Sequence, residues 1–264
     1  MQETSELYQQ ILLSDDYYVE TSLSIGEAGR LLTETGDVLL FGGDSVLLSG
    51  SGGDSGYGEN MLISVKTTRR LFSHGVPEVG CCPCGEIYVE MHMPLGEIPP
   101  RARLMPYVRL VSASNPMVYS EWLRKGVFYI DTRENTRNDD GLDILTIHGY
   151  DAMLMADTLY TPDSDISFPA KDIEVVRNIA KQMGVAVDSR CVPYLNKAYE
   201  IQLPVQYTKR EILGYIGAMY AGNWIMNDNG DLQLVTMYGL PEETSLLLDD
   251  HGFYITFGGD RIKL

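Results

Sequence analysis

The chain has 264 residues, of which 44% are hydrophobic and 22% charged, and its 20 basic and 37 acidic residues leave a net charge of −17. This length gives about two ordinary domains or one large β domain, and the composition excludes a disordered chain. The acidic balance disfavours a protein that grips nucleic acid through its phosphates, no apolar run reaches the ~18 residues of a membrane helix, and the acidic N-terminus does not match a signal peptide.

Charge is spread unevenly along the chain. Residues 1–60 carry one base and eleven acids, a net of −10, and residues 126–264 carry eleven bases and twenty-one acids, again −10. Residues 61–125 carry eight bases and five acids, a net of +3. The middle segment can therefore face an acidic surface of a neighbouring copy, although solvated faces that simply differ in charge are the commoner arrangement.

The N-terminal half predicts a short helix followed by strands. Leu7 and Ile11 share one face of a helix over 4–13, and alternation from Val19 to Ile25 predicts a strand with one buried face. Residues 31–58 alternate short apolar runs with Gly-rich turns, which predicts a hairpin insert. Further strands are predicted at 61–67, 86–93, 103–111, 127–132 and 142–148, and a short helical run at 150–157.

The C-terminal half predicts two longer helices and a hairpin. The helix at about 171–183 has acids in its first turn and Gly184 as its stop. The helix at about 209–221 begins at the capping box Thr208–Glu211 and is expected to end at Gly222. The turn 228–231, which contains Asn-Gly between apolar runs, then predicts a β-hairpin.

The cysteines form the sequence's most conspicuous cluster. Cys81 and Cys84 have the C-x-x-C spacing of a zinc or redox half-site, but Cys191 stands alone far downstream. A structural zinc needs four ligands, and a redox motif should open a helix. Here the alternating run from Gly85 predicts a turn that leads into a strand. We therefore favour structural thiols in a reducing compartment over a metal or redox site.

Other motifs that suggest chemistry also have simpler explanations. The run Gly53-Asp54-Ser55-Gly56 is similar to the nucleophile loop of chymotrypsin-like proteases, but their triad places His before Ser, and no His precedes Ser55. The acidic runs 138–141 and 227–231 lack EF-hand spacing and are better interpreted as turns. His148, beside Asp151, is better interpreted as a packed core or edge histidine. We assign no catalytic, cofactor-binding or metal-binding residue and expect no cofactor. Nothing in these residues demands an enzyme, and they indicate an acidic protein of the α+β class, mainly β, without assigning it a function.

Three stretches, in order, resemble one family. They are Ile98–Leu110 (IPPRARLMPYVRL), then Gly126–Asp131 (GVFYID) with Leu145–Met153 (LTIHGYDAM), and finally Thr208–Met219 (TKREILGYIGAM) with Gly230–Leu232 (GDL). Together they resemble the baseplate hub or tail-associated protein of bacteriophage tails, a family also labelled prophage endopeptidase tail. The resemblance extends over nearly the whole chain, each motif being loose, and the Gly-rich segment 36–58 departs from it.

The resemblance implies β-barrel-like domains with a few peripheral helices, assembled as a ring, usually a homotrimer, at the distal end of the tail tube. It implies contacts with a distal tail or tube protein, the tape measure protein and a spike or fibre, and passage of DNA through a channel without specific binding. The location implied is the virion tail tip, after synthesis in the bacterial cytoplasm. The family's endopeptidase label belongs to C-terminal extensions, and no hydrolase domain follows Leu264, so we expect a shortened or N-terminal part of a hub.

Two other functions stay open. One is a receptor- or host-surface-binding module of the tail, with residues 42–58 as its candidate ligand loop, and the other, less favoured, is a cell-wall hydrolase. For the domains, we expect a first β-barrel-like domain over 1–115 with the insert at 31–58. A second α+β domain is expected over 116–264, containing both helices and the C-terminal hairpin, with the boundary in the linker-like residues 112–120.

Overall fold

The chain folds into a mainly β structure with a few helices, which confirms the predicted class. The computed structural model describes residues 4–14, 16–26, 40–41, 45–46, 55–73, 75–94, 98–137, 141–195, 199–237, 256–257 and 260–261. The insert predicted at 31–58 lies mostly outside these described residues. Within the described part, no helix is long and apolar enough to cross a membrane.

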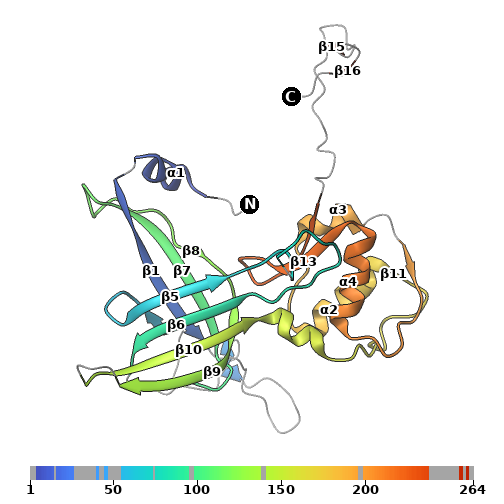
Figure 1. Cartoon of the computed structure of the whole chain (residues 1–264), viewed down its shortest axis with the longest axis horizontal. Coiled ribbons are helices and arrows are strands. Elements are labelled where there is room, and N and C mark those ends of the chain that lie inside the picture. The colour runs from blue at the N-terminus through green and yellow to red at the C-terminus, as the bar shows by residue number, and fades with distance from the viewer. Residues whose placement is uncertain are drawn as a thin grey trace.

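An eight-stranded antiparallel sheet forms one end of the molecule (Figure 1). Its strands are β1 (Tyr17–Gly26), β4 (Ser55–Tyr57), β5 (Leu62–Thr68), β6 (Glu86–His92), β7 (Arg103–Ser112), β8 (Leu123–Arg124), β9 (Phe128–Arg137) and β10 (Asp143–Asp151). They are ordered β4-β1-β7-β9-β10-β6-β5, with β8 paired to β7. The predicted strands at 61–67, 86–93, 103–111, 127–132 and 142–148 are thereby confirmed within a few residues.

The sheet curls around a single core, so it is barrel-like. Strands β6 and β10 turn alternate side chains inward, and the fully buried residues of the sheet include Leu23, Leu104 and Phe128. The buried residues of this core are Leu23, Ile25, Ile87, Val89, Met91, Ile98, Ala102, Leu104, Phe128, Ile130, Leu145 and Ile147. Burial of such aliphatic side chains, at about 1.5–3 kcal/mol each, is the main source of this unit's stability.

Helix α1 (Glu6–Leu13) packs on β7 at one end of the sheet. Its N-cap is Ser5, whose hydroxyl accepts a hydrogen bond from the Tyr8 amide at 3.1 Å, and whose own amide and hydroxyl donate to Glu121. Ile11 is the buried residue of the helix. The predicted helix at 4–13 is confirmed, although it begins two residues later because Ser5 serves as the cap.

The second unit has its own core, built on helices and a hairpin (Figure 1). Its elements are η1 (Ala152–Asp157), β11 (Ala170–Lys171), α2 (Asp172–Met183), η2 (Ser189–Cys191), α3 (Val192–Leu195), β12 (Glu200–Ile201), α4 (Lys209–Met219), β13 (Gly222–Met226) and β14 (Leu232–Thr236). Trp224 is fully buried at the centre, against the face of α4 that carries Gly217. The small pairs β2 (Leu40–Phe41) with β3 (Ser45–Val46), and β15 (Thr256–Phe257) with β16 (Asp260–Arg261), complete the described elements.

The caps of the two main helices agree with the sequence. Gly184 ends α2 in the left-handed conformation, with φ of 72°, and Thr208 with Glu211 forms the capping box of α4. The expected end of α4 at Gly222 is wrong, because the helix stops at Met219 and Gly222 already belongs to β13. Ala221 makes the turn between them, with φ of 44°. The helical run predicted at 150–157 is a 3₁₀ helix over 152–157.

The sheet takes strands from both sides of residues 112–120. That segment turns back onto β7, where Val111 bridges to Tyr119, and β9 and β10 then join the sheet begun by β1. The domain boundary predicted at 112–120 stays a prediction. For the description of the fold, we propose a division near Asp151, where β10 passes into η1, and we call the two parts the sheet unit and the second unit.

Candidate functional site: the junction between the two units

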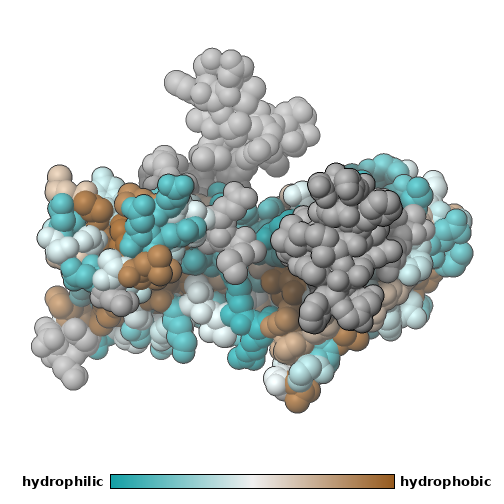
Figure 2. All heavy atoms as spheres, turned by 90° about the horizontal axis from the view of Figure 1, so that it is seen from above, coloured by the Kyte–Doolittle hydropathy of each residue, from teal (hydrophilic) through white to brown (hydrophobic). Residues whose placement is uncertain are grey.

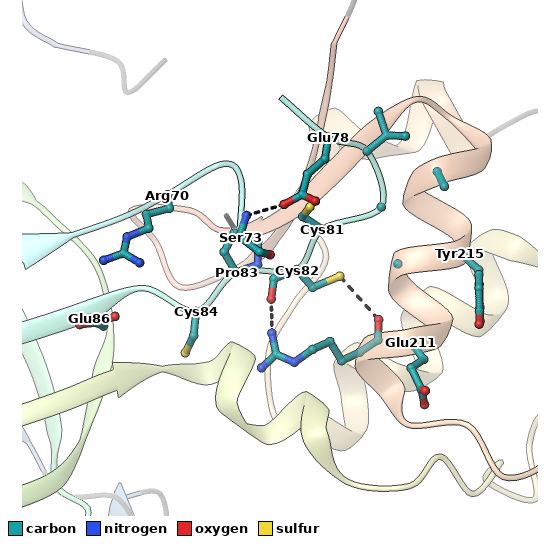
Figure 3. A pocket seen from close by; sticks show the side chains of 15 residues that line it. Arg70, Ser73, Glu78, Cys81, Cys82, Pro83, Cys84, Glu86, Glu211 and Tyr215 are labelled. Carbon is teal, nitrogen blue, oxygen red and sulfur yellow. Dashed lines mark hydrogen bonds between the residues drawn. The ribbon is translucent and has the colours of Figure 1, made fainter. Parts of the chain in front are cut away.

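A long loop from the sheet unit reaches across to the second unit. Residues 69–85, which connect β5 to β6, run beside β13 and α4 (Figure 3). The Gly80 amide donates to the Gly222 carbonyl at 2.9 Å, and the Trp224 amide donates to the Cys81 carbonyl at 2.9 Å. The loop thus adds backbone hydrogen bonds to the free side of the β13–β14 hairpin, and it holds the two units together from that side.

The side chain of Asn223 holds this loop in place through hydrogen bonds to its backbone. The side chain is fully buried on β13, and its amide nitrogen donates to the carbonyls of Leu71 and Glu78 at 3.0 and 2.9 Å. Its oxygen accepts from the Cys81 amide at 2.8 Å. A buried amide with all of these bonds made is well tolerated, whereas leaving any of the partners unpaired would cost about 1–3 kcal/mol.

Two glycines allow the loop and the helix to touch through their backbones. A Cβ placed on Gly214 of α4 would lie 2.7 Å from the Gly80 oxygen, and a Cβ on Gly80 would lie 2.8 Å from the Gly214 oxygen. Gly80 also has φ of 81°, in the left-handed region that favours glycine. Both positions therefore need to lack a side chain for the units to approach this closely.

The cysteine cluster lies in this loop, and its thiols point in different directions (Figure 3). The Cys82 sulfur lies 3.6 Å from the Arg210 carbonyl oxygen, and the Cys84 sulfur lies 3.2 Å from the Asp151 carboxylate. All four cysteines are free thiols. The described residues contain no group of three or more His, Cys, Asp or Glu side chains that could hold a metal ion.

The thiols are held in their protonated form. Burial raises the pKa of the Cys82 thiol to about 12, and burial together with the neighbouring Asp151 charge raises the pKa of Cys84 well above its usual range. The thiolate is the nucleophile and the metal ligand, so these raised pKa values disfavour the reactive form of Cys82 and Cys84 at neutral pH. As the sequence predicted, the cluster leads into a strand, β6.

Asp151, the last residue of β10, connects the sheet to η1 next to the end of the loop at Gly85. It is 4% exposed, and its carboxylate accepts hydrogen bonds from the amides of Gly85 and Met153 at 2.7 and 2.9 Å. Burial raises its pKa despite these donors. One carboxylate therefore caps η1 and fixes the start of β6.

Arg210 joins three segments at the same place. Its guanidinium donates to the carbonyl of Cys82 and, at 2.8 Å, to the carbonyl of Met153. It also forms an ion pair with Asp157, with 2.5 Å between Nε and Oδ1. A planar guanidinium can satisfy these acceptors at once, so Arg210 ties the loop and η1 to α4.

The turn between β13 and β14 forms a second contact with the sheet unit. Arg69 at the end of β5 pairs with Asp228 at 2.5 Å and donates to the Lys125 carbonyl. Arg124 on β8 donates to the Asp228 carbonyl at 3.1 Å and to the Asn229 side chain at 2.8 Å. The interpretation of 227–231 as a turn is confirmed, and the turn serves as a docking point.

Asp188 supports this turn from inside the second unit. It is 7% exposed and accepts from the Asn227 side chain at 2.7 Å. Hydrogen bonds from Arg190, the nearest at 2.5 Å, hold the pKa of Asp188 at about 2. Asn227 in turn accepts from the amides of Asn229 and Asp231 at 2.8 and 2.9 Å, so the turn's shape follows from local bonding.

The junction contains a cavity of about 750 Å³ between the loop and α4. Three of the polar side chains that line it are engaged within the chain: Glu78 accepts from the Ser73 amide at 3.0 Å, Glu211 caps α4, and Arg210 binds two carbonyls and Asp157. A ligand site normally directs several polar groups toward one place and leaves some of their hydrogen-bonding positions open for the ligand. These contacts join the loop of the sheet unit to α4 of the second unit.

The remaining sequence candidates lie apart from the junction. His148 is on the outer face of β10, 3.8 Å from the Glu86 carboxylate and edge-on to Tyr150, while Asp151 faces Cys84 instead. Ser55 belongs to the short strand β4, and Gly53 and Asp54 lie outside the described residues, as do 138–140 and most of the loop 42–58. Arg210, Asn223 and Gly80 were not singled out by the sequence, because the bonds they make join residues far apart along the chain.

The fold is similar to three solved structures. For the 43 kDa tail protein of prophage MuSo2 from Shewanella oneidensis, the TM-score is 0.47 at 12% identity over 87% of this chain and 59% of that chain. For the tail protein from Neisseria meningitidis MC58, the TM-score is 0.42 at 10% identity over 83% of this chain and 51% of that chain. For the Francisella PdpA–VgrG complex, the TM-score is 0.42 at 8% identity over 89% of this chain and 35% of that chain. The chain thus spans between about a third and three fifths of their lengths. No family model and no curated protein matches it.

Proposed function

We propose that this chain is a structural subunit of a bacteriophage or phage-like tail tip, a baseplate hub that closes the distal end of the tail tube. In this role it forms a ring, usually of three copies, and it contacts a distal tail or tube protein, the tape measure protein and a spike or fibre. DNA passes through the ring without being specifically bound. The protein acts by holding its neighbours in place, and it catalyses no reaction.

The observation that carries the proposal is where the family-like stretches lie in the fold. The stretch 98–110 supplies β7 with its core residue Leu104, and the stretches 126–131 and 145–153 supply β9, β10 and Asp151. The stretch 208–219 is α4, with Arg210 and Gly214. The resemblance thus falls on the barrel core and on the junction, which are the parts that fix how the two units are held relative to each other.

The contacts of the junction support a structural role over an enzymatic one. Its thiols are protonated, its carboxylates and guanidinium are bonded within the chain, and its backbones touch at two glycines. Such a junction makes the two units one rigid piece, which suits a subunit that must hold its position in a ring. An active site would instead leave a nucleophile or a general base directed into an open cavity.

The location of the chain in tails tests this function. Tails from the phage or prophage that encodes the chain should be labelled with antibodies against it and viewed by electron microscopy. We expect one cluster of label at the distal end of each tail. A matched antibody against the tube protein should label the shaft, and tails that lack the gene should carry no label. Label along the shaft, or its absence from complete tails, would contradict the proposal.

A further inference from the structure

An exposed group of mostly aromatic side chains lies on the sheet unit, at the start of β1 and in the segment 117–122. We call it the aromatic platform, and its members are Tyr18, Met117, Tyr119 and Trp122. Met117 is 83% exposed, and the three aromatic residues are 41–48% exposed. Figure 2 shows hydrophobic residues exposed at several separate places over one face of the molecule. The platform differs from scattered residues because its members come from adjacent segments of one sheet.

The register of the strands places the platform on the outer face of the sheet. Tyr18 of β1 lies opposite Val111 of β7, and Val111 bridges to Tyr119. On these same strands, Leu23 and Leu104 belong to the inner set and are fully buried in the core. Since side chains alternate along a strand, Tyr18 points away from that core, and Tyr119 lies beside it through the shared neighbour Val111.

Arg109 holds the platform in a fixed shape. Its guanidinium carbon lies 4.4 Å from the centre of the Tyr119 ring and 4.5 Å from that of the Trp122 ring. Its Nε lies 2.5 Å from a carboxylate oxygen of Glu20 on β1. The cation therefore stacks between two aromatic rings while its charge is neutralised from the side, so the rings are ordered before any partner binds.

The backbone around the platform is also ordered. The Ser112 amide donates to the Val118 carbonyl at 3.0 Å, and the Ser120 amide donates to the Leu110 carbonyl at 2.8 Å. The Met117 amide donates to the Asn115 side chain at 3.2 Å. A partner that lands here would not need to order the loop, and pre-ordered surfaces lose less entropy on binding. Tyr, Trp and Arg are the residue types that carry most binding energy at protein interfaces.

Charge indicates which partner fits. Acids border the platform: Asp16 precedes β1, Glu20 pairs with Arg109, and Glu121 precedes Trp122. A complementary surface therefore needs apolar side chains with bases around them. The sheet unit itself carries exposed bases away from the junction loop, at Lys66 and Arg101, in the segment 61–125 whose net charge is +3.

We propose that the aromatic platform is the contact surface for a second copy of this chain, which docks with the basic part of its own sheet unit. The contact joins two different surfaces, so repeating it around an axis closes a ring. This inference rests on the proposed function, because it names the partner that the ring requires. It assigns the interface to the sheet unit and leaves the junction free of it.

The test compares one added charge at two exposed positions. Met117→Asp places an acid in the platform on a side chain that contributes nothing to the core, and Val205→Asp places the same acid on a 63% exposed residue of the second unit. Self-association is measured by sedimentation velocity over a range of concentrations. We expect Met117→Asp to weaken self-association at least about tenfold, as the loss of a central contact does, and Val205→Asp to leave it unchanged.

Trp122→Ala provides a second variant, with near-UV circular dichroism as its check of folding. Folded Trp122→Ala protein should also associate at least about tenfold more weakly than the unsubstituted chain. Normal self-association of both platform variants would overturn this inference while the hub proposal stands, and so would equal weakening by Val205→Asp. An unsubstituted chain that never self-associates would overturn the inference and the ring together, and distal label on tails would then still support a location at the tail tip.

Discussion

At the scale of single residues, buried polar groups determine how the two units are joined. Asn223, Asp151 and Arg210 each bond to segments that are distant in sequence, and Asn223 reaches residues 142–152 positions away. No local pattern marks such a residue in advance, because the partner is brought near only by the fold. The strand predicted after the cysteines is confirmed, because the alternation that follows Gly85 is a local signal, whereas the structural role of the cysteines stays a prediction.

Acid should weaken the second unit through Asp188. Its pKa lies at about 2 in the fold, below the ordinary 3.8, so the fold favours its ionised form. The resulting stabilisation is fully present above pH ~4 and is lost as the pH falls toward 2. We expect Asp188 to contribute about 2 kcal/mol to the free energy of unfolding in neutral solution and little at pH 2.

Urea unfolding at a series of pH values from 2 to 6 measures this contribution. The Asp188→Asn variant should be less stable than the unsubstituted chain at pH 6, and the difference between them should shrink as the pH falls. Asp131→Asn, at an exposed position on β9, provides the matched control and should leave the pH dependence unchanged. A difference for Asp188→Asn that stays constant from pH 6 to 2 would show that the carboxylate's charge is not what stabilises the turn.

At the scale of elements, the helix ends marked by capping residues could be predicted from the sequence. The helix end that depends on packing against distant segments could not. The capping box at Thr208 and Gly184 at the end of α2 are visible in a few residues of sequence, and both helices begin or end where these signals lie. The end of α4 depends instead on the chain entering β13 beside the loop 69–85. The predicted end at Gly222 was therefore wrong by three residues.

The contact between α4 and the loop should be sensitive to one methyl group. Gly214→Ala places a Cβ 2.7 Å from the backbone oxygen of Gly80, so the loop must move away from the helix. Alanine favours a helix by up to ~1 kcal/mol over glycine, but overpacking costs about 1–3 kcal/mol. We expect a net loss of stability in urea unfolding and faster proteolysis of the loop.

Gly56→Ala is the matched control for this substitution. A Cβ on Gly56 of β4 meets nothing within 4 Å, so the same change should alter the free energy of unfolding by less than about 0.5 kcal/mol. If Gly214→Ala proved as stable as the unsubstituted chain, with an equally protected loop, the close backbone contact would not be what holds the units together.

At the scale of the whole molecule, the mainly β class and most strands followed from alternation in the sequence, but the arrangement of the strands did not. The sheet pairs β1 with β7 and β6 with β10, across long stretches of chain, and alternation gives no information about partners. For the same reason, strands on both sides of the expected boundary at 112–120 belong to one sheet. The proposed hub function rests on the resemblance, since the composition and motifs indicate only an acidic, β-rich chain.

The native mass of the purified chain, measured by light scattering with negative-stain imaging of the same fractions, tests the central claim most directly. One chain has a mass of 29.5 kDa. We expect a species of about three times that mass, as the usual symmetry of such rings implies, and images of a ring with a central hole. A mass of one chain at every concentration, with no ring in the images, would contradict a ring-forming hub and would favour a binding module of the tail.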